Sequence, residues 1–124
     1  MIQVRKIADE VNNGLTIKDW KNQLLEKIRH NYGNNIPSED TVVCYAADLI
    51  QDYHNTINNG RLWADNRDVT DSDVSNFAKI VIAILAGYGQ LSDYENADDS
   101  IVRIEAKLRQ EMTANAAASQ KDDD

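Results

Sequence analysis

Four residues spaced four apart, Asp40, Cys44, Asp48 and Asp52, most invite a chemical interpretation. On a helix this spacing puts all of them on one face, so that three carboxylates and a thiol lie together. Such a set could hold a metal ion or carry a reactive thiol. Thiolate formation needs nearby positive charge, however, and carboxylates raise the pKa of a thiol instead. We therefore expect a solvated acidic face with an incidental cysteine, and no metal ion or cofactor.

A second acidic cluster lies in the segment 64–73, ADNRDVTDSD. A calcium-binding loop of the EF-hand type needs a glycine at its sixth position and a glutamate at its last. A loop that began at Asp68 would end on Lys79, and no register supplies the glycine. These acids are therefore interpreted as turn residues and as the acidic first turn of a helix.

The two histidines, His30 and His54, lack a partner at the spacing of a metal site. Both are expected near helix C-termini, where the helix dipole favours histidine. A nucleophilic pair of Cys44 with a histidine from another helix stays open, with nothing but the presence of the residues to support it. The chain also has none of the phosphate-binding, zinc-protease or serine-nucleophile motifs. The sequence therefore predicts no catalytic residues.

The elements that would position these side chains are helices. The segment 71–88 has an apolar run, residues 80–85, that continues nearly all the way round a helix. A helix of that kind is buried on most sides. Thr70 is expected to cap this helix, and Gly89 is expected to stop it.

Amphipathic helices are predicted to surround it, over residues 2–11, from a Thr16 cap to a Gly33 stop, from a Ser38 cap to about 54, and from about 98 onward. The sequence therefore predicts an all-α fold, a compact bundle of about five helices around a buried central helix at 71–88. Residues 1–113 are expected to form a single helical domain, and the small and charged residues 114–124 a flexible acidic C-terminal tail.

The last predicted helix has a narrow apolar seam, formed by Ile101, Ile104, Leu108 and Met112. The seam favours packing on the chain's own core. Pairing with a second copy, which would make a homodimer, stays open as an alternative.

The chain of 124 residues has a net charge of −8, and residues 39–73 alone carry −6. Binding to nucleic acid needs clustered lysine and arginine, so direct binding to a phosphate backbone is not expected. The single cysteine, the absence of a signal-type N-terminus and the lack of a long apolar stretch favour a cytoplasmic protein without membrane contact.

The acidic middle could instead face a basic partner protein. The loop at 55–69 contains Trp63, which either attaches the loop to the core or contributes to a binding loop. The partner-binding residues expected from these patterns are Asp48, Asp52, Arg61, Trp63, Asp65 and Asp68.

Three functions are compatible with these patterns. The favoured one is a non-enzymatic acidic protein that binds and inhibits or caps a partner protein, in the broad manner of immunity proteins, phage inhibitors and chaperones. The first alternative is a nucleic-acid mimic that fills the basic groove of a DNA-binding protein. The second is a small enzyme that uses Cys44 or His54.

Overall fold

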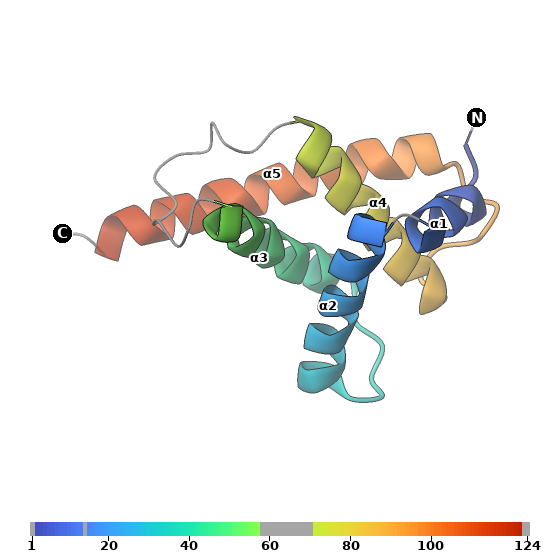
Figure 1. The fold of residues 1–124 in the computed structure, drawn as a ribbon, viewed down its shortest axis with the longest axis horizontal. Helices are drawn as coiled ribbons and strands as arrows, with labels where there is room; N and C mark the ends of the chain where they lie inside the picture. Colours follow the sequence, from blue (N-terminus) through green and yellow to red (C-terminus); the bar gives the residue numbers. More distant parts are fainter. Residues whose placement is uncertain (1, 14, 58–70, 123–124) are drawn as a thin grey trace.

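The computed structural model describes residues 2–13, 15–57 and 71–122, and the side chains of 2–13, 18–50 and 71–114. These residues form five helices: α1 (Val4–Asn13), α2 (Leu15–Tyr32), α3 (Glu39–Ile57), α4 (Asp71–Gly87) and α5 (Ala97–Asp122). Figure 1 shows α5 along the length of the molecule with α3 beside it, while α2 projects away from the bundle. The predicted all-α bundle is confirmed.

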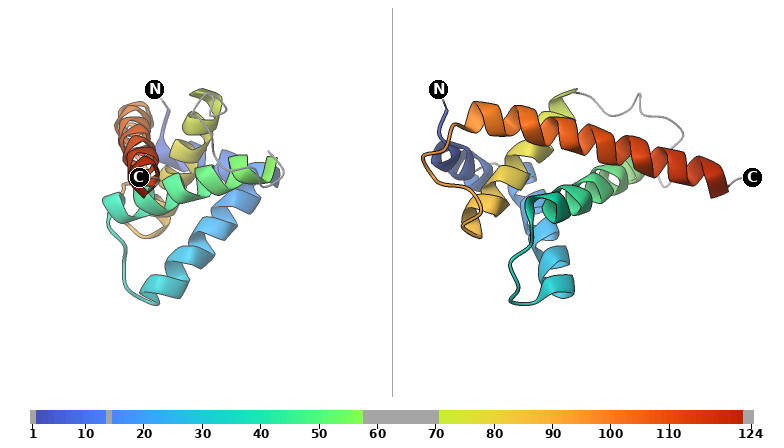
Figure 2. Two further views of the ribbon diagram at one scale, coloured as in Figure 1. Left: turned by 90° about the vertical axis from the view of Figure 1, so that its left-hand side faces the viewer. Right: turned by 180° about the vertical axis from the view of Figure 1, so that it is seen from behind.

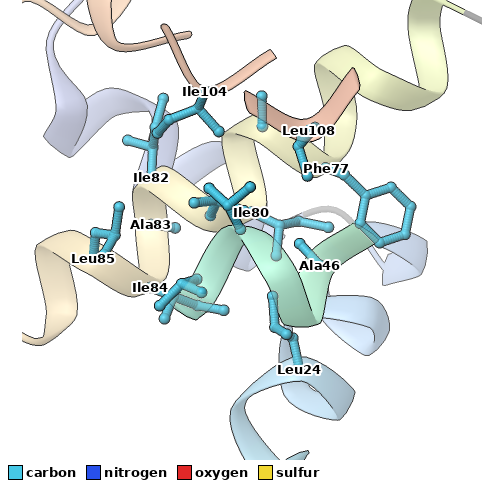
Figure 3. Packing of buried hydrophobic residues seen from close by; sticks show 14 of the residues in the cluster. Leu24, Ala46, Phe77, Ile80, Ile82, Ala83, Ile84, Leu85, Ile104 and Leu108 are labelled. Carbon is cyan, nitrogen blue, oxygen red and sulfur yellow. The ribbon is translucent and has the colours of Figure 1, made fainter. Parts of the chain in front are cut away.

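The central helix of the bundle is α4, as the sequence predicts. It contacts each of the other four helices. Every residue from Ile80 to Leu85 is buried, and Ile82 has no exposed surface at all. Figure 3 shows Leu24 of α2, Ala46 of α3 and Leu108 of α5 converging on it. Because residues 80–85 of this helix are apolar on all sides, their burial removes apolar area from water in every direction, which is the main favourable contribution to folding.

At the ends of α3 and α4, hydrogen bonds satisfy backbone groups that have no partner within the helix. The Ser38 hydroxyl accepts a hydrogen bond from the Thr41 amide at 3.3 Å, so Ser38 caps α3 as predicted. At the end of α4, the amides of Gly89 and Gln90 donate to the carbonyls of Ala86 and Leu85. This is the Schellman arrangement, and it requires the positive φ of 76° that Gly89 adopts.

Gly33 ends α2 in the related way, with a φ of 59° and its amide bonded to the Arg29 carbonyl. The expected Thr16 cap of this helix is wrong, because α2 begins at Leu15 and so includes Thr16. The expected Thr70 cap of α4 lies outside the described residues.

The two glycines at the end of α4 predict opposite effects of an alanine. Gly87 is helical and a Cβ there meets nothing within 4 Å, so Gly87→Ala should stabilise the protein by about 0.5–1 kcal/mol through helix propensity. Gly89→Ala should destabilise it by about 1–2 kcal/mol, because Gly89 is left-handed. Thermal melts of the two variants check this, with shifts of about 2–6 °C in opposite directions expected. Shifts of the same sign would contradict the assigned end of α4.

The N-terminus is attached to the turn between α4 and α5. Gln3 and Asn96 form an antiparallel bridge. The Arg5 amide donates to the Asp93 carbonyl and the Ala97 amide to the Ile2 carbonyl. These bonds satisfy backbone groups at the starts of α1 and α5 together. They fix the two segments at one end of the molecule, where Figure 2 shows the N-terminus beside the start of α5.

At its other end, α5 is longer than the sequence suggested. The predicted tail begins at residue 114, whereas the backbone stays helical to Asp122. The physical reason is the alanine content of 114–118, since alanine has the highest helix propensity of all residues. The segment lacks an apolar stripe that could pack on the core, but its alanines are enough to keep the backbone helical. None of the described helices combines the length and the apolar character needed to cross a lipid bilayer.

Candidate functional site

The acidic start of α3 is held by the cations of α5. Glu39 accepts two hydrogen bonds from the Arg103 guanidinium, at 2.9 and 3.3 Å. The Lys107 ammonium donates to Glu39 and also to Asp40, at 2.8 Å to the latter. Burial raises the pKa of Glu39, but the hydrogen bonds from Arg103 and Lys107 outweigh this and the pKa is lowered. Part of the predicted acidic face is therefore neutralised within the chain.

The start of α4 is held in the same way. The Arg109 guanidinium donates to Asp71 at 2.7 Å. Both partners are largely exposed, so the pair contributes little to stability by itself. Its effect is on the charge distribution, because another carboxylate of the acidic middle segment is taken up by a cation of α5.

Cys44 lies on the exposed surface of α3. Partial burial raises the pKa of its thiol, and the carboxylates of Asp48 and Glu111 raise it further. A raised pKa is the reverse of what a nucleophilic or redox-active thiol needs. Within the described part of the chain, no group of histidine, cysteine and carboxylate side chains has the arrangement of a metal site.

Only some of the predicted partner-binding residues belong to the part of the chain that the structure describes. The structure places Asp48 near Cys44 on α3, half-buried and engaged in an interaction of its own. Arg61, Trp63, Asp65 and Asp68 lie outside the described residues, as do the side chains of Asp52 and His54. The second histidine, His30, is exposed near the C-terminus of α2. The prediction that this set binds a partner therefore stays a prediction.

Sequence reasoning missed an exposed surface where the N-terminus meets the start of α5. We call the side chains of Ile2, Asp93, Tyr94, Asp98 and Val102 the acidic end surface. Tyr94 is 71% exposed and Val102 69%. Asp98 lies one helical turn before Val102 and accepts a hydrogen bond from the Ile2 amide at 3.5 Å. Neither Asp93 nor Asp98 forms an ion pair with any described cation.

A cleft of about 530 Å³ between α2 and the end of α4 is the second feature that the sequence pattern did not reveal. Lys21, Leu25 and Arg29, four residues apart on α2, form one wall. The opposite wall contains Ala83, Ile84, Gly87 and Tyr88, and the loop residues Gly33 and Asn34 close one end. The four-residue spacing on α2 was the available signal, but it lies beside the apolar stripe that predicted the helix.

Two aromatic contacts attach α2 to its neighbours, one before and one after the lining residues Lys21 to Arg29 in the chain. The rings of Trp20 and Phe77 lie with their centroids 6.0 Å apart, joining α2 to α4. At the other end, Tyr32 meets Tyr45 of α3 edge-on at 6.4 Å. Between them Leu24 and Ile28 are fully buried. The cleft is thus the gap that remains where the small residues of α4 face this anchored helix.

The comparisons with known proteins add no assignment, because no family model, curated protein or solved structure matches the chain.

Proposed function

We propose that this chain is a non-enzymatic binding protein that caps or inhibits a partner protein with a basic surface. The observation that carries the proposal is the acidic end surface, where exposed Tyr94 follows Asp93 in the chain and exposed Val102 lies one helical turn after Asp98. Neither of these two carboxylates has a described cationic partner. Exposed apolar side chains with a charged rim are typical of surfaces that bind proteins.

The energetic roles of the two kinds of side chain differ. Tyrosine is a frequent hot spot, because its ring buries a large apolar area while its hydroxyl keeps a hydrogen bond. The carboxylates contribute mainly to the rate of association and to the choice of partner. Arg5 and Lys6 are exposed in the first turn of α1, but residues 93–102 contain four acids and no cation. The segment 93–102 therefore carries a net negative charge, and Arg103, which interacts electrostatically with Glu95, borders it.

The two alternative functions have less support among the described residues. A nucleic-acid mimic needs an array of free carboxylates, whereas Glu39, Asp40 and Asp71 are paired with α5. An enzyme based on Cys44 needs an activated thiol, and the pKa of this thiol is raised by burial and by neighbouring acids. The lone cysteine also supports the proposal of a cytoplasmic location, where thiols stay reduced.

The test compares capture of proteins from the source cells by the immobilised wild-type chain and by the double variant Tyr94→Ala/Val102→Ser. We expect a protein with a basic surface to be enriched by the wild type and reduced about 30-fold or more in the variant, which is the effect of losing a hot spot of about 2 kcal/mol. Its retention should also fall between about 0.1 and 1 M salt, since the Debye length shortens from about 10 to about 3 Å.

Ile36→Ala is the matched control, because Ile36 is also a large apolar side chain, 59% exposed, but lies in the loop between α2 and α3. It should leave capture unchanged. Equal capture by the wild type and by the double variant would rule out the acidic end surface as the binding site. All three proteins are first compared by circular dichroism, and the substitutions at exposed positions should leave the helix content the same.

A further inference from the structure

We propose that the cleft between α2 and α4 is a binding site for a small amphiphilic anion, a molecule with an apolar body and a carboxylate or phosphate group. The apolar body would lie on Leu25, Ile84 and Tyr88, and the anionic group would bind Lys21 or Arg29. This site and its ligand are separate from the partner surface proposed above.

The volume and lining of the cleft indicate that it could hold a small molecule. A space of about 530 Å³ falls within the range of about 300–1,000 Å³ that is typical of small-molecule sites. Its lining combines the apolar side chains of Leu25, Ala83 and Ile84 with polar groups that could orient a ligand, a combination that is also typical of such sites. The cleft is therefore large enough for one aromatic or short aliphatic ligand.

The charge of the lining residues indicates that the ligand is an anion. Lys21 and Arg29 are both cationic, and no carboxylate lines the cleft although the chain as a whole carries −8. The Lys21 ammonium donates to the side-chain carbonyl of Asn12 of α1 at 2.6 Å, a neutral partner that does not line the cleft, so its charge is not paired. The Arg29 guanidinium forms no ion pair with any side chain that the structure describes. The cleft is thus a cationic site on an acidic protein.

The environment of Lys21 is consistent with a binding role. Partial burial lowers the pKa of its ammonium group, and the neighbouring Lys18 lowers it further. An anion bound beside it would relieve the repulsion between the two lysines and restore a favourable environment for the charge. Titratable groups perturbed by burial and by a specific neighbour, inside a cleft, are often found at binding sites.

The C-terminal end of α4 also lines the cleft, and its dipole would oppose an anion there. The carbonyls of Ile84, Leu85 and Ala86 are all occupied, however, because they accept the amides of Tyr88, Gln90 and Gly89. No free acceptor from these three residues therefore faces the anion. The C-terminal end of α2 lies at the same cleft, since Arg29 is in its last turn. The two helix dipoles therefore favour an orientation in which the apolar body lies over the end of α4 and the anionic group lies at Lys21, far from the end of α2.

The test is an NMR titration of the ¹⁵N-labelled full chain with 2-naphthoate, and in parallel with 2-naphthamide, a neutral molecule of the same shape. We expect naphthoate to cause saturable shifts of the Gly33, Gly87 and Tyr88 amides. Naphthamide should bind at least about tenfold more weakly, because it lacks a charge-assisted hydrogen bond. Equal binding of the two probes, shifts that do not saturate, or shifts centred elsewhere would each overturn the proposal.

Three variants locate the site. Lys21→Gln and Arg29→Gln each remove one cation, and at least one of them should weaken naphthoate binding about tenfold without affecting naphthamide. Lys27→Gln is the matched control, because it removes a cation of the same helix that does not line the cleft. If neither lining variant weakens binding more than Lys27→Gln does, the cationic site is rejected.

A fourth variant fills the cleft. A Cβ at Gly87 meets nothing within 4 Å, so Gly87→Leu should place its side chain in the open space and block both probes while the chain stays folded. Should Gly87→Leu alter the circular dichroism spectrum, Gly87→Ala gives a smaller obstruction at the same position. Unimpeded binding of naphthoate to a folded Gly87→Leu protein would show that the probe lies elsewhere.

Discussion

Replacing Ile82 with aspartate should unfold the protein at 25 °C. Ile82 is fully buried at the centre of α4, and its neighbours along the helix from Ile80 to Leu85 are buried as well. The variant loses the apolar contacts of the side chain, worth about 2–5 kcal/mol, and places an unpaired carboxylate in a low-dielectric interior at a cost of several kcal/mol more. A domain of this size has a total stability of about 5–15 kcal/mol.

The measurement is the helical circular dichroism signal together with a urea titration. Ser72→Asp is the matched control, because it introduces the same charge into α4 at an exposed position in the first turn, where the helix dipole favours an acid. Ile82→Val provides a milder change and should lower the unfolding free energy by only about 0.5–1.5 kcal/mol. Wild-type helix content and stability in Ile82→Asp would contradict the placement of α4 at the centre of the core.

The centre of the fold was predictable because its sequence leaves few alternatives. Residues 80–85 are apolar at every position, so a helix through them must be covered on all sides whichever elements cover it. The glycine stops at Gly33 and Gly89 were predictable for a related reason, since a positive φ is inexpensive only for glycine. Both inferences depend on local properties of the chain, and both are confirmed.

Helix boundaries were harder to predict from the sequence where two local signals disagree. Thr16 has the preferred chemistry of a helix cap, yet α2 begins one residue earlier. At the other end of the chain, the segment after Ala114 lacks an apolar stripe but is rich in alanine, and the helix continues through it. The missing apolar stripe predicted a frayed tail for this segment, whereas its alanine content predicts a helix, and the helix is what the structure has.

The surface was harder to predict than the core, because the charges of α3 are paired across the fold. Glu39 and Arg103 are separated by 64 positions along the chain. The sequence shows that both charges are present, but it does not show that the two side chains form an ion pair in the folded protein. The cleft has the same origin, since Lys21 and Gly87 lie on helices whose packing order the sequence did not reveal. Candidate sites therefore required the tertiary arrangement, whereas the class of fold did not.

Truncating Leu108 to alanine should destabilise the protein by about 2–5 kcal/mol, the cost of removing buried methyl groups and leaving a cavity. Leu108 and Ile104 have no exposed surface, and Ile101 and Met112 pack against the same core. The apolar seam of α5 is therefore used within one copy of the chain, where the sequence had also allowed a homodimer. Val102→Ala, on the exposed side of the same helix, should change the stability by no more than about 0.5 kcal/mol.

The packing of the seam against the chain's own core gives this prediction a second readout. If the seam packs only within one chain, the melting temperature of the wild type should not depend on protein concentration. A dimer that uses the seam would instead melt at higher temperature as the concentration rises, because association stabilises the folded state by mass action. Urea unfolding of Leu108→Ala, combined with melts of both proteins over a hundredfold range of concentration, separates the two cases. A melting temperature that rises with concentration in the wild type and not in Leu108→Ala would mean that Leu108 contributes to contacts between copies.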